Sequence, residues 1–277
     1  MKRFGLIGHP VAGSFSPKLF EAAYGGRYPY DLIEGADFGA SWQRFLDEYA
    51  GINVTAPFKE FAFRAVDALS DDARLCGAVN LAVKTPSGIV GYNTDVAGVV
   101  LAVREALAGL ASPDPQPVIP GSTDTQPVIP GSPDKQPVIP GSTGNLLKEA
   151  LVVGCGGAGR AAAVAALRLG CRVTLANRTP SRAAALADDL GCDWIPTEGI
   201  AALSPDLVIY TVPGPMDGFP EFPEAIILEA NYRTPCLEGR GKAYISGRRW
   251  LLFQAVAGYE IFTGETPDAG AMFRIFC

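Results

Sequence analysis

The chain of 277 residues contains a single histidine, His9. A mechanism that needs a histidine base, or a metal site built from several histidines, therefore has at most this one candidate. The six cysteines, at positions 76, 155, 171, 192, 236 and 277, include no C-x-x-C pair. In a chain of this length, such scattered cysteines indicate reduced core residues rather than a disulfide framework or a zinc site.

The sequence also lacks long apolar runs and an excess of positive charge. No run approaches the roughly 18 apolar residues of a membrane span, and residues 4–8 are too short for the apolar segment of a signal peptide. The net charge of −6 and the pI near 4.9 argue against a nucleic-acid partner. We therefore expect a cytoplasmic protein, without membrane or nucleic-acid partners, that acts on a small-molecule substrate. Its oligomeric state, monomer or homodimer, cannot be read from the sequence.

Strands and helices alternate along both halves of the chain, which predicts α/β architecture with about two cores. In the first half, we expect alternating strands and helices at residues 3–7, 18–24, 30–34, 39–49 and 52–55. A helix with apolar positions at Phe63, Val66 and Leu69 follows, and then strands at 77–83 and 89–92. In the second half, we expect strands at 150–153, 172–176, 207–212 and 225–229, and helices at 160–169 and 247–257. The expected fold is an N-terminal α/β substrate domain with a mostly parallel sheet plus a Rossmann-type domain.

Residues 51–59 are the first candidate for chemistry. A short buried strand is expected at 52–55, and Pro57 then ends ladder bonding and favours a helix start. Lys59 therefore falls in or just before a first helical turn. A cation there interacts unfavourably with the helix dipole, at a cost of about 0.3–1 kcal/mol. A lysine at this position is therefore expected to have a function, such as that of a proton donor. An exposed surface lysine is the alternative.

Two serines precede an earlier helix start. Ser16 followed by Pro17 is typical of an N-cap and a first helical residue. Capping does not explain Ser14. Two hydroxyls at a helix N-terminus also form a site for a carboxylate, because the free N–H groups and the dipole point the same way.

Three further polar residues lie among apolar neighbours. Asn80 is expected inside an apolar strand, where its amide needs partners or costs about 1–3 kcal/mol. Asp95 precedes an apolar helical pattern, so it either begins that helix or pairs with Lys59. Gln254 lies in the apolar C-terminal helix, where a buried amide between helices is one explanation.

A glycine-rich turn, residues 154–159, joins a strand to a helix in the second half. Such a turn lets backbone amides approach a pyrophosphate at the helix N-terminus. At the end of the next strand, where NAD-binding folds usually place an acidic residue on the ribose, this chain has Asn177 and Arg178. Arg178 and Arg182 lie about one helical turn apart and can clamp a 2′-phosphate, which predicts NADP(H) as the cofactor. Surface arginines at a helix start are the alternative.

Residues 112–144 interrupt this pattern. The sequence QPVIPGS begins at Gln116, Gln126 and Gln136, a ten-residue period that is too short for repeat folds built from helix pairs or blades. The P-x-x-P spacing allows a polyproline ligand, but no flanking feature supports a partner. We expect an exposed, poorly ordered insertion in a surface loop.

Taken together, these motifs resemble those of the shikimate dehydrogenase family. The resemblance rests on residues 8–17, 53–59, 77–80, 93–95, 154–159, 177–179 and 247–255, which follow in family order and cover the chain apart from the repeat. It implies reduction of 3-dehydroshikimate to shikimate with NADPH, in aromatic amino acid biosynthesis. It also implies a substrate-binding catalytic domain at 1–110 to which residues 235–277 return, an insertion at 111–145, and a Rossmann NADP-binding domain at 146–234.

The resemblance also assigns roles to individual residues. It implies that Lys59 and Asp95 are the catalytic pair. For the substrate, it implies Ser14 and Ser16 at the carboxylate, Thr55, Asn80 and Gln254 at the ring hydroxyls, and Tyr232 facing the ring. For the cofactor, it implies Gly154, Gly156, Gly157, Ala158 and Gly159 at the pyrophosphate, Asn177, Arg178, Thr179 and Arg182 at the adenosine phosphate, and Gly247 at the nicotinamide. No metal is expected, since the nicotinamide supplies the hydride.

The chain also departs from the family pattern. Gly13 and Phe20 stand where members often carry histidine, residues 209–213 replace a strand end that usually reads Asn-Ala-Thr, and Glu229 replaces a common aspartate. Two other functions remain open. One is an NAD-preferring quinate/shikimate dehydrogenase, against which the serine and arginine pairs argue. The other is a non-catalytic dinucleotide or metabolite sensor, against which the presence of both Lys59 and Asp95 argues.

Overall fold

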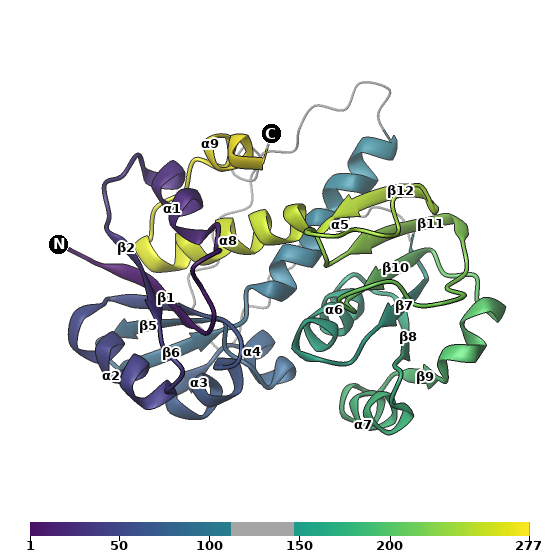
Figure 1. Ribbon diagram of the computed structural model, residues 1–277, viewed down its shortest axis with the longest axis horizontal. Helices are drawn as coiled ribbons and strands as arrows, with labels where there is room; N and C mark the ends of the chain where they lie inside the picture. The colour runs from purple at the N-terminus through teal and green to yellow at the C-terminus, as the bar shows by residue number, and fades with distance from the viewer. Residues whose placement is uncertain (112–146, 277) are drawn as a thin grey trace. The chain divides into compact units, whose positions relative to one another are not determined.

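The computed structural model describes residues 1–111 and 147–276, which form two compact units. Residues 1–94 and 254–276 make up the first unit, and residues 95–111 and 147–253 the second. Each unit contains its own six-stranded sheet flanked by helices, which confirms the expected α/β class (Figure 1). The repeat at 112–144 lies outside the described residues.

The sheet of the first unit is mostly parallel, as predicted. Its strand order is β2-β1-β3-β5-β6-β4, and only β5 runs antiparallel to its neighbours. The strands are β1 Phe4–Gly8, β2 Tyr30–Glu34, β3 Gly51–Val54, β4 Ala68–Leu69, β5 Leu81–Thr85 and β6 Gly88–Tyr92. The helices of this unit are α1 Ser16–Tyr24, α2 Phe38–Glu48, α3 Lys59–Ala65, α4 Asp71–Cys76, the part of α8 Gly247–Thr263 that follows Phe253, α9 Ala269–Phe273 and the short η2 Arg274–Phe276. Every residue of β1 is buried, which explains its uninterrupted apolar run.

Two local predictions in the first unit are wrong. The helix expected through Leu69 ends at Ala65, and Leu69 lies in β4, paired with Gly91 of β6. The strand expected from residue 77 begins only at Leu81, because Gly77 ends α4 with a φ of 60°. That left-handed conformation favours glycine and stops the helix. Asn80 is therefore the last residue before β5 rather than a residue within it.

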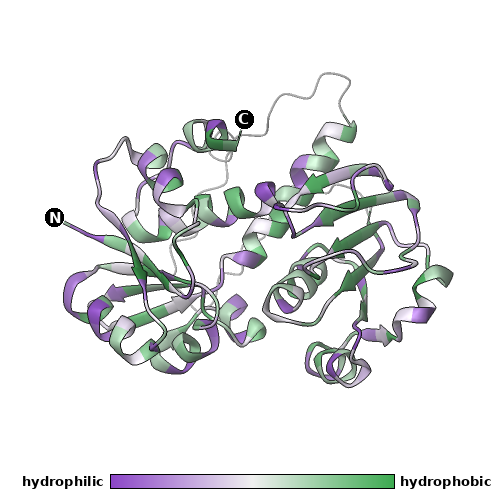
Figure 2. Cartoon of the chain, in the orientation of Figure 1, coloured by the Kyte–Doolittle hydropathy of each residue, from purple (hydrophilic) through white to green (hydrophobic). Residues whose placement is uncertain are grey.

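The second unit has the predicted Rossmann topology. All its strands are parallel, in the order β12-β11-β10-β7-β8-β9, which is the doubly wound order of dinucleotide-binding sheets. The strands are β7 Glu149–Val153, β8 Arg172–Ala176, β9 Asp193–Ile195, β10 Leu207–Tyr210, β11 Phe222–Glu229 and β12 Gly241–Ser246. Helices α5 Asp95–Ala111, α6 Gly157–Arg168, α7 Pro180–Leu190 and η1 Thr197–Ala202 accompany them, as does the first part of α8 Gly247–Thr263. Figure 2 shows hydrophobic residues concentrated along the central strands β7, β10 and β11.

The unit boundaries differ from those expected at residues 110 and 235. Helix α5 packs against α6 and β12, so residues 95–111 belong with the second sheet. Strand β12 pairs with β11, so residues 241–246 also belong there, and only the chain from Gln254 onward groups with the first unit.

Within residues 1–111 and 147–276, no helix combines the length and the apolar character that crossing a membrane would require.

Candidate active site

A buried amide forms the centre of the candidate site in the first unit. The Asn80 side chain is 4% exposed. Its Nδ2 donates to Thr94 Oγ1 at 3.1 Å and to Gln254 Oε1 at 3.2 Å, and its Oδ1 accepts the Thr94 N–H at 2.8 Å. The amide thus has the partners that burial demands. The structure brings together two residues predicted to bind substrate hydroxyls, although 174 positions separate them in sequence.

Two residues that had no predicted role extend this centre. Asn53 in β3 donates from Nδ2 to the Asn80 carbonyl at 3.3 Å, and its Oδ1 accepts the Tyr30 hydroxyl at 2.8 Å. Asn53 was part of a recognised motif, and an amide among the apolar residues of β3 was a usable signal. Nothing in the sequence around Tyr30 indicated that it lies here, because only the pairing of β1 with both β2 and β3 brings the two residues close.

The backbone of Lys59 is joined to the same centre. Lys59 is the first residue of α3, as expected, and its carbonyl accepts the Val79 N–H at 3.0 Å. Asn93 Nδ2 donates to the Ala78 carbonyl at 3.0 Å, which fixes the segment next to Thr94. The first bond holds the start of α3 against residues 78–80, and the second holds Asn93 against the same segment.

Asp95 follows Thr94 directly in the chain and is the first residue of α5. It is 8% exposed, and its carbonyl accepts the Trp250 Nε1–H of α8 at 2.9 Å. The first-turn placement agrees with one of the two explanations of Asp95, and it leaves the second, a pairing with Lys59, as a proposal. No group of His, Cys, Asp and Glu side chains suited to a metal ion occurs in the part of the chain that the structure describes.

The serine pair lies at the start of α1, but Ser16 is not its N-cap. The cap position is Phe15, and the Ser14 hydroxyl lies 3.2 Å from the Ser16 N–H, which donates to it, and 3.1 Å from the Ser16 hydroxyl. Ser14 therefore satisfies an N-terminal amide of the helix, while Pro17 occupies a position that needs no N–H partner. The two hydroxyls lie side by side at a helix N-terminus, where an anion is favoured.

Thr55 comes directly after β3 and is half-buried. A Cβ on Gly8 would lie 2.3 Å from Thr55 Cγ2, so Gly8 leaves the room that the threonine methyl occupies. The backbone of Thr55 is fixed at both ends, because its N–H donates to the Ile7 carbonyl and its own carbonyl accepts the Phe58 N–H. The position of this side chain is thus set by β1 as much as by β3.

The glycine-rich turn of the second unit fits a dinucleotide pyrophosphate. Gly154 has a φ of 100°, and a Cβ on Gly159 would lie 1.9 Å from the Gly154 carbonyl oxygen, so α6 approaches the turn as only glycine allows. In contrast, a Cβ on Gly156 or Gly157 would meet nothing within 4 Å. The start of α6 around these glycines is exposed, as a phosphate site at a helix N-terminus requires.

The end of β8 is tied to this turn. Asn177 accepts the Cys155 N–H on its Oδ1 at 3.2 Å and donates from Nδ2 to the Thr179 carbonyl at 3.0 Å. Arg178 and Arg182 are both exposed, the second in the first turn of α7. Neither guanidinium has a carboxylate partner within the described ranges. Two exposed cations beside the turn suit a phosphate-bearing ribose.

Gly247 and the loop that carries Tyr232 are in contact in the second unit. A Cβ on Gly247 would lie 2.3 Å from the Ala230 carbonyl oxygen. The loop is held at its base by Glu229, which is fully buried and accepts hydrogen bonds from the Cys236 and Leu237 amides and the Tyr244 hydroxyl at 2.9–3.1 Å. Glu229, a departure from the family pattern, therefore shapes the Tyr232 loop.

Residues 209–213, the other departure from the family pattern in this unit, contact the glycine-rich turn. Thr211 Oγ1 donates to the Val153 carbonyl at 2.9 Å and lies where a side chain on Gly154 would have to be. The Tyr210 hydroxyl donates to the Gly214 carbonyl at 2.7 Å, and burial raises the pKa of Tyr210 to about 12. Both side chains thus order the loop after β10.

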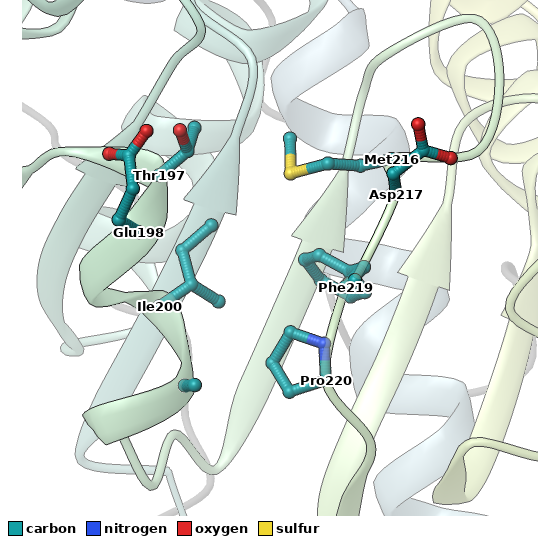
Figure 3. Close-up of a pocket in the computed structure, with 9 residues that line it drawn as sticks. Thr197, Glu198, Ile200, Met216, Asp217, Phe219 and Pro220 are labelled. Carbon is teal, nitrogen blue, oxygen red and sulfur yellow. The ribbon is translucent and has the colours of Figure 1, made fainter.

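A pocket in the second unit lies apart from these residues. It has a volume of about 210 Å³ between η1 and the loop after β10, and Figure 3 shows Ile200, Phe219 and Pro220 inside it, with the carboxylates of Glu198 and Asp217 at one end. None of the predicted site residues lines it. Two carboxylates disfavour an anion, so this pocket does not suit a phosphate or a substrate carboxylate.

Comparison with known proteins agrees with this geometry. Residues 6–82 match the family model described as the shikimate dehydrogenase substrate binding domain. The NADP(+)-dependent shikimate dehydrogenase of Acidiphilium cryptum is 35% identical over 95% of this chain and 91% of its own length. The chain belongs to the shikimate dehydrogenase family.

Solved structures of this family share the fold. The shikimate 5-dehydrogenase of Thermus thermophilus, in complex with NADP(H) and shikimate, has a TM-score of 0.77 at 27% identity, and the match covers 99% of this chain and 98% of that one. The quinate dehydrogenase of Corynebacterium glutamicum, in complex with NAD, has a TM-score of 0.76 at 25% identity, with coverage of 99% and 98%. Overall fold therefore does not separate the two substrate and cofactor preferences, and the side chains must do so.

Proposed function

We propose that this chain is an NADP-dependent shikimate dehydrogenase, which reduces 3-dehydroshikimate to shikimate reversibly in the route to aromatic amino acids. The observation that carries the proposal is the hydrogen-bonded centre of Asn80, Thr94 and Gln254, to which the start of α3 is joined through Lys59. Buried polar groups from separate stretches meet there in a family whose named relatives catalyse this reaction. On the sequence grounds given above, we expect the enzyme to act in the cytoplasm.

The substrate contacts follow from the chemistry of these side chains. Ser14 and Ser16 at the N-terminus of α1 suit the carboxylate, because hydroxyl and amide donors converge there. Thr55, Asn80 and Gln254 suit ring hydroxyls, since each can both donate and accept hydrogen bonds. We assign Tyr232 to the ring as well, on a loop that Glu229 fixes at its base.

Lys59 and Asp95 are proposed to carry the proton chemistry. Reduction of a ketone builds negative charge on the carbonyl oxygen, and the Lys59 ammonium can stabilise that charge and then donate a proton to the same atom. Asp95, nearly buried at the start of α5, would orient the ammonium. In the reverse direction, the Lys59 amine would accept the proton of the substrate hydroxyl.

The second unit supplies the cofactor site. The amides at the start of α6, around Gly156, would hold the pyrophosphate, Gly247 the nicotinamide end, and Arg178 with Arg182 the 2′-phosphate. When bound, the reduced nicotinamide supplies the hydride, so the protein needs no metal ion for this reaction. The two exposed guanidiniums support NADP rather than NAD.

The deciding experiment is turnover by the purified full-length protein. We expect oxidation of shikimate with NADP⁺ to be much faster than with NAD⁺, and shikimate to be preferred over quinate. Turnover mainly with NAD⁺ and quinate would instead show a quinate dehydrogenase, to which the fold is similar. Tight binding of shikimate or dinucleotide without any turnover would show a sensor.

Replacing Lys59 tests the proposed proton donor. We expect Lys59→Ala to lower kcat by about 10²–10⁴-fold while the dissociation constant for shikimate, measured by calorimetry, changes little. The matched control is Lys84→Ala, because Lys84 donates to the Leu46 carbonyl away from the candidate site. Loss of shikimate binding together with kcat would contradict a role confined to proton transfer.

A further inference from the structure

A buried tyrosine joins the two parts of the proposed substrate site in the first unit. Tyr259 in α8 is 1% exposed, and its hydroxyl donates to the Ser16 carbonyl at 3.0 Å. Its ring stacks edge-on against Phe20 of α1, with the centroids 4.7 Å apart. Helix α8, which carries Gln254, passes close to α1 (Figure 1), and Tyr259 bonds it to Ser16, the first residue of α1.

The same helix is fixed closely against the amide centre. A Cβ on Gly258 would lie 2.8 Å from Leu81 Cδ1 and 3.5 Å from Thr94 Oγ1. Gln254 lies one turn earlier on this face and meets Asn80. A glycine at 258 thus sets how near α8 comes to the hydroxyl-binding residues, and Tyr259 sets where α1 lies relative to α8.

Tyr259 is also part of a cluster of hydroxyl groups. The Tyr30 and Tyr259 ring centroids are 6.1 Å apart. Burial raises the pKa of the Tyr30 phenol well above its ordinary value, the neighbouring Tyr259 adds to this, and the Ser16 hydroxyl opposes it. Tyr30 in turn donates to Asn53, which donates to the Asn80 carbonyl. The hydrogen bond of Tyr259 to Ser16, its ring contact with Tyr30 and the hydrogen bonds of Tyr30 and Asn53 therefore connect the serine pair with the amide centre within the first unit.

We propose that Tyr259 is a positioning residue that holds Ser16 in register with Gln254 and Asn80. A small rigid ring that carries a carboxylate at one end and hydroxyls at the other must be bound at both ends at once. A shift of α1 along α8 would therefore weaken the carboxylate contacts first. This inference rests on the proposed function, because it takes the serine pair as the carboxylate site and the amides as the hydroxyl site.

The test compares two phenol deletions. Tyr259→Phe keeps the ring and removes only the donor to Ser16. Tyr24→Phe is the matched control, since the buried Tyr24 hydroxyl donates to the Tyr259 carbonyl at 2.8 Å and to that of Glu265 at 3.1 Å, without touching Ser16. Both variants lose a buried phenol hydroxyl at the same interface of α1 with α8. Because the Tyr24 hydroxyl also accepts from Thr263 Oγ1 at 2.9 Å, Tyr24→Phe should lose at least as much stability as Tyr259→Phe.

We expect Tyr259→Phe to raise KM for shikimate about fivefold, because that factor corresponds to the loss of roughly one hydrogen bond. The values of kcat and of KM for NADP⁺ should stay within about twofold of the wild type, by the same measure. Tyr24→Phe should leave KM for shikimate within that same margin. With the methyl ester of shikimate, which lacks the carboxylate, the difference between Tyr259→Phe and the wild type should disappear. p-Aminophenylalanine at position 259, which restores a donor, should bring KM back toward the wild-type value.

Three results would overturn the inference. They are an unchanged KM in Tyr259→Phe, an equal rise in Tyr24→Phe, and an equal rise for the methyl ester. If Tyr259→Phe does not fold, the aminophenylalanine variant decides, because a fivefold rise despite the restored donor contradicts the role. If the wild type binds shikimate without turnover, the same ratios are read from dissociation constants, and only the proposed function has failed. If it binds no shikimate, both fail.

Discussion

At the scale of single residues, two buried polar side chains, Asn80 and Glu229, have hydrogen-bond partners. Asn80 satisfies its amide with Thr94 and Gln254, and Glu229 accepts hydrogen bonds from the base of the Tyr232 loop. The thiols show the effect of burial, which raises the pKa of Cys155, Cys171 and Cys236 to about 11. All five described cysteines are free, and these three are neutral at physiological pH and therefore weak nucleophiles.

The two exposed arginines provide the clearest test of cofactor choice. We expect Arg178→Ala with Arg182→Ala to raise KM for NADP⁺ by about 10–100-fold or more, because charge-assisted hydrogen bonds to the 2′-phosphate are lost. KM for NAD⁺, which lacks that phosphate, should hardly change. Steady-state kinetics with both cofactors measure this. Arg172→Ala is the control, since Arg172 pairs with Glu149 at the opposite end of β8, and an equal loss there would point to general charge effects.

At the scale of secondary-structure elements, close contacts between elements and hydrogen bonds near strand ends set how helices and strands are placed within each unit. Helix α6 approaches the Gly154 carbonyl closely, and the phenol of Tyr259 links α8 to α1. The starts of β7 and β10 and the middle of β11 are likewise joined through one residue. Asp206 accepts the Lys148 and Glu149 amides at 2.7 and 3.0 Å, and its carbonyl accepts the Ile226 N–H.

Gly159 tests the approach of α6 to the turn. A Cβ there would lie 1.9 Å from a backbone oxygen, so Gly159→Ala must displace the helix start. We expect a loss of about 1–3 kcal/mol in the free energy of unfolding and a clear rise in KM for NADP⁺. Urea denaturation and kinetics measure both. Gly157→Ala, where the added methyl meets nothing within 4 Å, should leave stability nearly unchanged, and equal destabilisation would contradict the explanation.

Asp206 predicts a defined pH dependence of stability. Burial alone would raise the pKa of Asp206, but hydrogen bonds from the Glu149 and Lys148 amides outweigh it and hold the pKa below the ordinary 3.8. A carboxyl whose folded-state pKa is depressed contributes stability above its unfolded-state pKa, and that contribution is lost as pH falls through the folded-state value. Asp206→Asn should therefore cost about 0.5–1 kcal/mol at pH 7, allowing for solvent screening.

The difference between Asp206→Asn and the wild type should be constant above about pH 5 and should shrink once the pH falls below about 4. Thermal unfolding across the pH range measures it. Asp217→Asn is the control, because that exposed carboxylate has no hydrogen-bond or ion-pair partner within the described residues. A difference that grows toward low pH would have the wrong sign.

At the scale of the whole molecule, the two units carry different parts of the proposed chemistry. The residues assigned to the substrate lie in the first unit except for Tyr232, and the residues assigned to the cofactor lie in the second. Asp95 stands at the point where the chain passes from the first unit to the second. Substitutions in the substrate residues of the first unit are therefore expected to change substrate binding and leave cofactor binding unchanged, and substitutions in the cofactor residues of the second unit should do the reverse.

The repeat at 112–144 gives a prediction at this scale that the sequence alone supports. Its low charge and short period indicate an insertion in a surface loop, and removing it leaves a connection of ordinary length between a helix and the next strand. We expect the deletion variant to keep kcat and both KM values within about twofold, since surface-loop insertions are well tolerated. Kinetics and thermal unfolding measure this, and a collapse of activity would mean that the repeat takes part in function.

The sequence by itself determined the class of fold, the Rossmann turn and most strands, because periodicity, glycine spacing and proline positions act locally. The prediction from sequence was wrong where a local pattern fitted more than one secondary structure, as at Leu69 and at the start of β5. It named Ser14, Asn80 and Gln254 but not what they touch. Only the tertiary structure decided that Asn53, Tyr30 and Tyr259 join them, because hydrogen bonds between residues far apart in the chain depend on strand order and helix packing, which leave no periodic trace in the sequence.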